Sequence, residues 1–140
     1  MHTVADLLAE RKGQEVVWVD PLACVYDALK LMNERDVGAL LVQIDEYLVG
    51  IVSERDYVRK VILDTHEAKK LKVSEIMTRD VITVTRDDTV VNCINLMKQH
   101  HFRHLPVVEA GKAIGIVSLR DLFLDVIDDN IETLTVVGGA

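Results

Sequence analysis

Short groups of apolar residues, separated by polar and turn-forming residues, run along most of the chain and predict small strands that alternate with helices. The apolar residues before Asp20-Pro21 are β-prone, whereas those that follow recur three and four positions apart, as on one face of a helix. The expected elements of the first half are a strand at 16–19, a helix at 22–35, strands at 39–42 and 48–52, and a helix over 53–62. A further helix is predicted from Thr3, because a Thr-x-x-Asp spacing precedes Leu7, and Gly13 is expected to end it.

The second half of the chain repeats this order of elements. Its expected elements are a short helix at 73–77, a strand at 81–84, a helix at 88–100, strands at 104–108 and 113–117, and a helix at 119–128. The sequence therefore predicts a first unit over 3–63, a polar linker over 64–72, a second unit over 73–128 and a tail over 129–140.

The two halves also share a sequence motif. Gly50-Ile51-Val52-Ser53-Glu54-Arg55-Asp56 returns 65 positions later as Gly115-Ile116-Val117-Ser118-Leu119-Arg120-Asp121. An internal repeat of this kind predicts two copies of one supersecondary unit, neither of which buries its apolar face alone. We therefore expect an α+β (α/β) fold of two β-α-β-β-α units, packed sheet to sheet around a pseudo-two-fold axis, with a ligand cleft between them.

Composition narrows the functional classes. The 140 residues are 49% hydrophobic, which is enough for a buried core, and a net charge of −7 argues against nucleic acid and anionic membranes as partners. No signal peptide and no long uncharged apolar run is seen, so a cytoplasmic protein is expected. Cys24 and Cys93 fit buried small apolar residues in a reducing compartment rather than a disulfide.

The repeated motif, the lead-in Val73-Ser74-Glu75-Ile76-Met77-Thr78 and the segment Phe102-Arg103-His104-Leu105-Pro106-Val107-Val108 together give the chain a family resemblance. It resembles a tandem pair of CBS domains, a Bateman module, over residues 3–128, and it is similar to the stand-alone members. The resemblance implies a regulatory module without catalysis that binds an adenine nucleotide, such as AMP, ADP, ATP, NAD or S-adenosylmethionine. It also implies a homodimer that signals to a protein partner in trans.

Ser118, Arg120 and Asp121 are the first candidate site residues, and two interpretations compete for them. A Ser that precedes a helix with an acidic residue three positions later is typical of a capping box. The same helix start can hold a ligand, and the resemblance implies that Asp121 binds ribose while Ser118 and Arg120 reach phosphate. Their counterparts Ser53, Arg55 and Asp56 are candidates for a first-repeat site. An Asp that folds back on its own helix would not also be able to hold a sugar.

Arg103 and His104 lie where a strand begins, and they fit either a solvated strand edge or a phosphate site. The resemblance implies phosphate contact, and protonation of His104 would add charge as the pH falls toward about 6.5. Their counterparts in the first repeat are Gly38 and Ala39, so the two clefts are expected to differ. A metal site at His100, His101 and His104 is not expected, because no Cys, Asp or Glu lies beside them at ligand spacing.

The starts of the first strand in each repeat are candidates for contact with an adenine ring, with core packing as the alternative. In the second repeat these candidates are Val81, Ile82 and Thr83, together with Met77 and Thr78 before them. In the first repeat they are Val17 and Trp18, and Trp18 is expected to fill the core or block the cleft rather than stack on a base.

No arrangement of nucleophile, base and orienting group stands out, so an enzyme is not expected. The resemblance implies a nucleotide sensor instead. The alternative is a protein-interaction module that binds no nucleotide and uses its Asp residues only as caps. The last helix of each unit carries more apolar surface than one small sheet needs, which favours homodimerisation through these helices. The residues are Val58, Val61, Ile62, Leu122, Phe123, Val126 and Ile127.

Overall fold

The computed structural model describes residues 2–10 and 16–127. The first repeat contains α1 (Val4–Ala9), β1 (Trp18–Val19), α2 (Val25–Arg35), β2 (Ala39–Ile44), β3 (Tyr47–Ser53), α3 (Glu54–Tyr57) and the π-helix η1 (Val58–Ile62). The 3₁₀ turns η2 (Ala68–Lys70) and η3 (Val73–Glu75) lead into the second repeat, which contains α4 (Val90–His100), β4 (His104–Glu109), β5 (Lys112–Ser118) and a helix over 119–127. The order of a helix, two strands and a further helix therefore occurs in both repeats, as expected.

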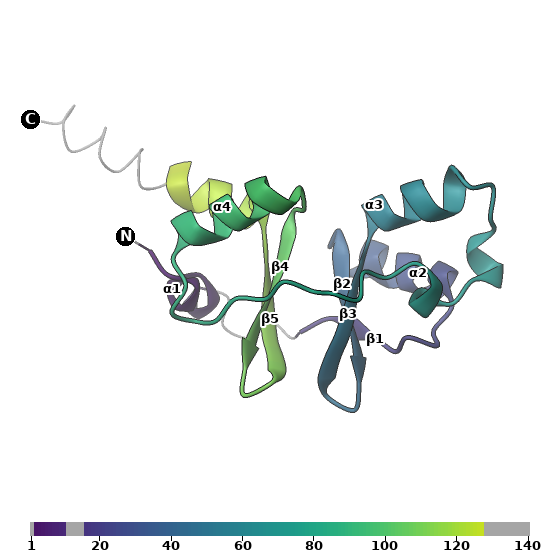
Figure 1. Ribbon diagram of the computed structural model, residues 1–140, viewed down its shortest axis with the longest axis horizontal. Helices are drawn as coiled ribbons and strands as arrows, with labels where there is room; N and C mark the ends of the chain where they lie inside the picture. The colour runs from purple at the N-terminus through teal and green to yellow at the C-terminus, as the bar shows by residue number, and fades with distance from the viewer. Residues whose placement is uncertain (1, 11–15, 128–140) are drawn as a thin grey trace, which may run out of the picture.

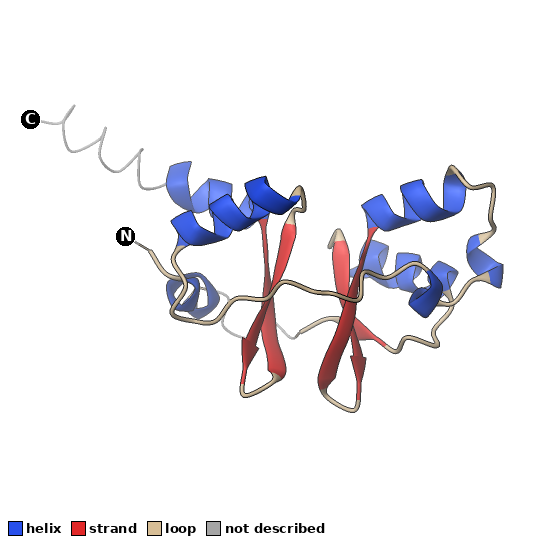
Figure 2. Cartoon of the chain, viewed as in Figure 1, coloured by secondary structure: helices blue, strands red, loops and turns tan. Residues whose placement is uncertain are grey.

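The strands lie in the order β1-β2-β3-β5-β4, and the two halves meet at one registered pair, Tyr47 with Lys112. β1 runs parallel to β2, whereas β2 with β3 and β4 with β5 form antiparallel hairpins. Figure 1 shows the two hairpins side by side in the middle of the molecule, and Figure 2 shows the helices toward its two ends. The expected α+β fold of two similar repeats is thus observed, with β1, β2 and β3 in the first repeat and β4 and β5 in the second.

The two hairpins are built alike in detail. Each has a register shift at the same place, between Val42 and Gln43 in one and between Val107 and Val108 in the other. Each also closes on two residues with positive φ, namely 57° and 118° at Asp45-Glu46 and 52° and 80° at Ala110-Gly111. Positive φ at both turn residues matches the twist of a two-residue hairpin, which keeps the strands paired up to the turn.

The hydrophobic core is divided into two clusters, and the segment before each repeat packs into the cluster of the other repeat. Val4 and Leu7 of α1 belong to the cluster around β4 and β5. Val73 and Met77 belong to the cluster around β2 and β3. The two repeats therefore exchange their lead-in segments, which ties them together more firmly than the single strand contact at Tyr47 does.

Three expectations about local structure need correction. Residues 81–84 do not form a strand, since only Val84 pairs, in a parallel bridge with Val107. The short helix expected at 73–77 is the 3₁₀ turn η3, and the linker contains the turn η2. The helix after Ser53 changes from α to π at Val58, so its last turn is wider than a regular helix. Gly13 and the tail over 129–140 lie outside the described residues.

Candidate ligand-binding cleft

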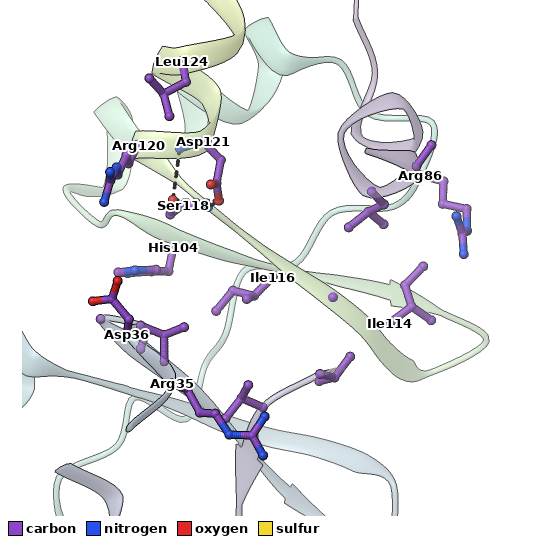
Figure 3. A pocket seen from close by; sticks show the side chains of 18 of the residues that line it. Arg35, Asp36, Arg86, His104, Ile114, Ile116, Ser118, Arg120, Asp121 and Leu124 are labelled. Carbon is purple, nitrogen blue, oxygen red and sulfur yellow. Dashed lines mark hydrogen bonds between the residues drawn. The ribbon is translucent and has the colours of Figure 1, made fainter. Parts of the chain in front are cut away.

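A cleft of about 1060 Å³ lies between the two repeats, and we call it the inter-repeat cleft (Figure 3). This volume is in the range of pockets that hold small molecules. The first repeat forms one wall of the cleft and the second repeat forms the opposite wall. Residues of α1 complete the lining. The lining residues are Ala5, Leu8, Ala9, Val16, Val17, Arg35, Asp36, Val37, Gly38, Ala39, Arg86, His104, Ile114, Gly115, Ile116, Ser118, Arg120, Asp121 and Leu124.

Ser118 and Asp121 lie on the wall of this cleft where β5 passes into the helix over 119–127 (Figure 3). The Oδ2 atom of Asp121 accepts hydrogen bonds from the backbone N–H of Ser118 at 2.9 Å and from its hydroxyl at 2.7 Å. The backbone N–H of Asp121 donates to Oγ of Ser118 at 3.1 Å. The capping-box interpretation of these residues is therefore correct, and the cap holds both side chains at the cleft.

His104 begins β4 and stands at the junction of the repeats. Its ring lies 3.5 Å from where a Cβ atom on Gly38 would be, so a larger residue at position 38 would press on the imidazole. Burial lowers the pKa of His104, the negative charge of Asp121 raises it, and the positive charge of Arg103 lowers it. The net effect is a lowered pKa, so this imidazole is mainly neutral at neutral pH.

The structure brings together five of the residues that the sequence singled out. Ser118, Arg120, Asp121, His104 and Val17 all line the inter-repeat cleft. The remaining candidates are not among its lining residues, namely Ser53, Arg55, Asp56, Met77, Thr78, Val81, Ile82, Thr83, Arg103 and Trp18. Trp18 does not fill the core, because it is 50% exposed, and it does not line this cleft. That it blocks a first-repeat cleft stays a prediction.

The grouping of candidates by repeat is also corrected. Val17 of the first repeat shares a cleft with Asp121 of the second. Met77 and Thr78 instead lie on β3, where the backbone N–H of Ile51 donates to the carbonyl of Thr78 at 3.0 Å. β3 leads directly to Asp56. Each motif therefore meets the lead-in of the other repeat, because the lead-in segments are exchanged.

The first-repeat motif makes the same cap. The Oδ2 atom of Asp56 accepts from the backbone and the hydroxyl of Ser53 at 2.9 and 3.1 Å, while its Oδ1 atom lies 3.2 Å from Nζ of Lys60. Arg55 donates from Nη1 to the backbone carbonyl of His101 at 2.9 Å, so this end of the first repeat contacts the second.

Several residues of the inter-repeat cleft were missed by the sequence analysis. Arg35 and Asp36 reach it from the C-terminal end of α2, where Asp36 takes a left-handed conformation with φ 53°. Leu8 and Arg86 reach it from outside both copies of the motif. One feature of the sequence could have indicated Arg35 and Asp36. They lie just before Gly38, which is the counterpart of the candidate Arg103 at the 65-residue offset.

Other chemistry is limited within residues 2–10 and 16–127. No group of three or more His, Cys, Asp or Glu residues there is placed to hold a metal ion. Nor does that part of the chain contain a helix with the length and apolar character needed to span a bilayer.

The two cysteines have different surroundings. Cys24 donates its thiol to the carbonyl of Ala68 at 3.3 Å. Burial, followed by the charge of Asp88, raises the pKa of Cys93 to about 11.

Two similar units, joined by exchanged lead-in segments and separated by a cleft, define a tandem-repeat module. The CBS domain family model matches residues 4–63 and 73–128, and the chain belongs to this family. It is 36% identical over 141 residues to the CBS domain-containing protein CBSX3, mitochondrial, of Arabidopsis thaliana, covering 94% of this chain and 68% of that protein.

Solved structures agree with this assignment. The crystal structure of the CBS domain protein NE2398 has a TM-score of 0.84 and 44% identity, covering 89% of this chain and 97% of the other. The CBS-domain containing protein ATU1752 from Agrobacterium tumefaciens has a TM-score of 0.81 and 33% identity, covering 88% and 98%.

Proposed function

We propose that this chain is a non-catalytic regulatory sensor that binds an adenine nucleotide of the AMP, ADP, ATP or NAD class in the inter-repeat cleft. The observation that carries the proposal is the composition of the cleft. A carboxylate, a helix start and a partly buried imidazole lie at one part of it, and apolar side chains line much of the rest. A flat apolar ring joined to a polar sugar and an anion is complementary to such a surface.

Each polar residue would have a separate role in this proposal. Asp121 would accept hydrogen bonds from the ribose hydroxyls, because a carboxylate is acceptor-only and takes two donors well. Ser118 would anchor the helix start, whose backbone N–H groups face anions favourably. Arg120 would contact phosphate, and a bound phosphate would favour protonation of His104.

The two repeats would take more than one arrangement relative to each other. The signal would be a shift in the populations of these arrangements. Val17 and Gly38 come from the first repeat, while Ile116 and Asp121 come from the second, so a single ligand would contact both. A ligand that binds one arrangement better than another shifts the population toward it. Because each lead-in segment packs into the core of the other repeat, a rearrangement at the cleft would be passed from one repeat to the other.

A structural neighbour shows that this fold accommodates adenosyl ligands. The CBS domain pair of protein MJ0100 was solved in complex with 5′-methylthioadenosine and S-adenosyl-L-methionine. It has a TM-score of 0.81 and 23% identity to this chain, so the likeness concerns the fold. It supports the ligand class and leaves the particular nucleotide to experiment.

The outer helices supply the proposed interface for homodimerisation. Val58 and Ile62 on η1 are 46% and 51% exposed, and Phe123 on the helix over 119–127 is 62% exposed. Exposed apolar residues on these helices favour an interface, whereas Val61 and Leu122, which the sequence analysis also counted, are buried. A regulated protein in trans is the further partner we propose, whereas nucleic acid and membranes are not proposed because of the net charge of −7. A cytoplasmic location remains a prediction, and the Arabidopsis relative is named as mitochondrial.

One observation favours the second candidate, a protein-interaction module that binds no nucleotide. Both motif carboxylates are already used as helix caps, and Asp56 also pairs with Lys60. In that case the Asp residues would serve folding alone.

Thermal unfolding and calorimetric titration of nucleotide-stripped protein with AMP, ADP, ATP, NAD, NADH and S-adenosylmethionine would separate the two candidates. A ligand at 100 times its dissociation constant stabilises the folded state by about 2.7 kcal/mol, which raises the melting temperature by several degrees. We expect such a shift with at least one nucleotide, and its loss in Asp121→Ala. The matched control is Asp56→Ala, which loses the same kind of cap and should keep the shift. No shift with any of these ligands would favour the interaction module.

A further inference from the structure

α1 places one leucine directly over the glycine of the second-repeat motif. A Cβ atom built on Gly115 would lie 2.9 Å from Cδ2 of Leu8, so the leucine side chain occupies the space that only a glycine leaves open. Leu8 also lines the inter-repeat cleft, and Gly115 lies on its floor between Ile114 and Ile116. The leucine is thus both packed on the motif and facing the ligand space.

α1 presents two different faces, which explains how Leu8 reaches the cleft. Val4 and Leu7, three positions apart, are 0% and 5% exposed and belong to the core of the second repeat. Ala5, Leu8 and Ala9 recur at the same helical spacing and line the cleft. Because two of these three are alanine, Leu8 is the large apolar side chain that α1 contributes to the ligand space.

The position of Leu8 is fixed by contacts at the start of α1. Thr3 and Asp6 form a capping box. The backbone N–H groups of Val4 and Ala5 donate to the carbonyls of Asp88 and Arg86 at 2.8 and 3.0 Å. A helix of six residues would be marginal alone, but here it is held against the second repeat at both its cap and its buried face. The leucine therefore needs little ordering when a ligand binds.

The first-repeat motif has an equivalent side chain. A Cβ atom on Gly50 would lie 2.7 Å from Sδ of Met77, so Met77 covers Gly50 as Leu8 covers Gly115. The two covering residues do not align at the 65-residue offset of the motifs, and only the exchanged packing relates them.

We propose that Leu8 packs against the flat ring of the bound ligand and is a specificity-determining residue of the inter-repeat cleft. The inference rests on the proposed function, because it assigns the apolar part of that same site. Leu8 would select a ligand that carries a planar base over one that carries only the sugar and phosphate. Ile114, Ile116 and Val17 would complete the apolar surroundings of the ring.

Methyl-labelled leucine NMR tests the contact directly, with AMP and ribose 5-phosphate as probes. A purine ring stacked on Leu8 should shift its δ-methyl signals upfield on addition of AMP, whereas ribose 5-phosphate should not. Leu7, which is next in the chain and is buried in the core of the second repeat, is the internal control whose methyl signals should move little. Binding of AMP without a shift at Leu8 would overturn the inference while leaving the proposed function intact. No binding of AMP, ADP, ATP or NAD by the wild-type chain would overturn both.

Affinity measurements give a second readout. We expect Leu8→Ala to weaken AMP binding about tenfold, the scale for loss of a few apolar groups from a binding pocket, and to leave ribose 5-phosphate unchanged. Leu8→Met keeps the volume and should bind AMP within about threefold of wild type. Leu7→Ala is the matched control that should lower stability without changing the preference for AMP over ribose 5-phosphate. If Leu8→Ala fails to fold, Leu8→Val tests the same preference. An equal effect of the substitution on both ligands would contradict the inference.

Discussion

Asp121 Oδ2 lies 2.7 Å from Oγ of Ser118, so the carboxylate proposed to hold a ribose is also the cap of its own helix. The two uses are compatible, since the capped side chain lines the inter-repeat cleft. The capped geometry instead orients the carboxylate before any ligand arrives. Pre-orientation of this kind lowers the ordering cost of binding.

The paired motifs allow the folding and binding roles of the carboxylates to be separated. Asp121→Ala and Asp56→Ala should each lower the free energy of unfolding by about 1 kcal/mol, the typical cost of losing a helix-capping interaction. Asp56→Ala also loses the pair with Lys60, worth about 0.3–0.5 kcal/mol. Only Asp121→Ala should abolish nucleotide binding in the inter-repeat cleft. Urea unfolding and calorimetric titration measure the two effects, and equal loss of binding in both variants would contradict the assignment.

The pH dependence of stability should carry a contribution from His104. Its folded-state pKa is lowered from the ordinary value of 6.5, so the unfolded chain binds the proton more readily than the folded one. Stability from this residue is therefore complete above about pH 6.5 and is lost as the pH falls toward the folded-state pKa. The groups that oppose and assist this shift are Asp121 and Arg103, respectively.

The measurement is urea unfolding of the wild type and His104→Gln at pH 7.5 and 5.5. Glutamine does not titrate, so the variant should lose less stability than the wild type between these two pH values. The other histidines and the carboxylates are common to both proteins and cancel in the comparison. An identical loss in the two proteins would show that His104 titrates normally.

The sequence predicted the repeated architecture because its signals are local and occur twice. Helix caps, hairpin turns and apolar periodicity depend on residues a few positions apart, and Ser53 with Asp56 and Ser118 with Asp121 form the same hydrogen bonds. The prediction of a strand at 81–84 is wrong. Val81 and Ile82 have high β-propensity, but a strand also needs a partner strand, and only Val84 forms a bridge.

The composition of the candidate site could be predicted only in part, because it depends on exchanged segments. The 65-residue offset places Val81 and Arg103 in the same repeat as Asp121, and the sequence analysis therefore grouped these candidates together. The structure instead pairs Asp121 with Val17, Gly38 and Leu8. No local pattern shows that α1 crosses to the other core, since Val4 and Leu7 would fit either apolar cluster equally well.

Thiol reactivity should differ sharply between the two cysteines. Burial raises the pKa of Cys93 to about 11, and its side chain is fully buried, so little reactive thiolate exists at pH 8. We expect labelling of Cys93 by iodoacetamide in the native protein to follow the rate of transient unfolding, and labelling of Cys24 to be faster. Mass spectrometry of tryptic peptides after timed labelling distinguishes the sites. Equal rates under native conditions would show that the core around Cys93 opens easily.

The proposed dimer interface predicts a change in assembly without a change in fold. Ile62→Asp combined with Phe123→Asp places charges on the exposed outer helices and should convert a dimer into a monomer. Leu22→Asp is the matched control, because Leu22 is 69% exposed but lies before α2, away from these helices. Sedimentation equilibrium measures the mass, and circular dichroism checks the fold. A wild-type chain that is monomeric at 100 μM, or a double variant that still dimerises, would contradict the interface.

The two motif glycines should respond differently to alanine although their local sequences are the same. A Cβ atom on Gly50 would lie 2.7 Å from Sδ of Met77 and 2.9 Å from the backbone carbonyl oxygen of Thr78. The carbonyl belongs to the bridge between Thr78 and Ile51 and cannot move without breaking it. On Gly115 the close contact is with a terminal methyl group of Leu8, which can rotate away. Gly50→Ala should therefore cost about 1–3 kcal/mol of stability, as overpacking of a core does, and Gly115→Ala clearly less.

Gly115→Ala should weaken nucleotide binding more than it lowers stability, because the displaced leucine faces the inter-repeat cleft. Thermal unfolding and titration of the two variants side by side test this, and the reverse order of stabilities would show that the α1 contact is the more rigid one.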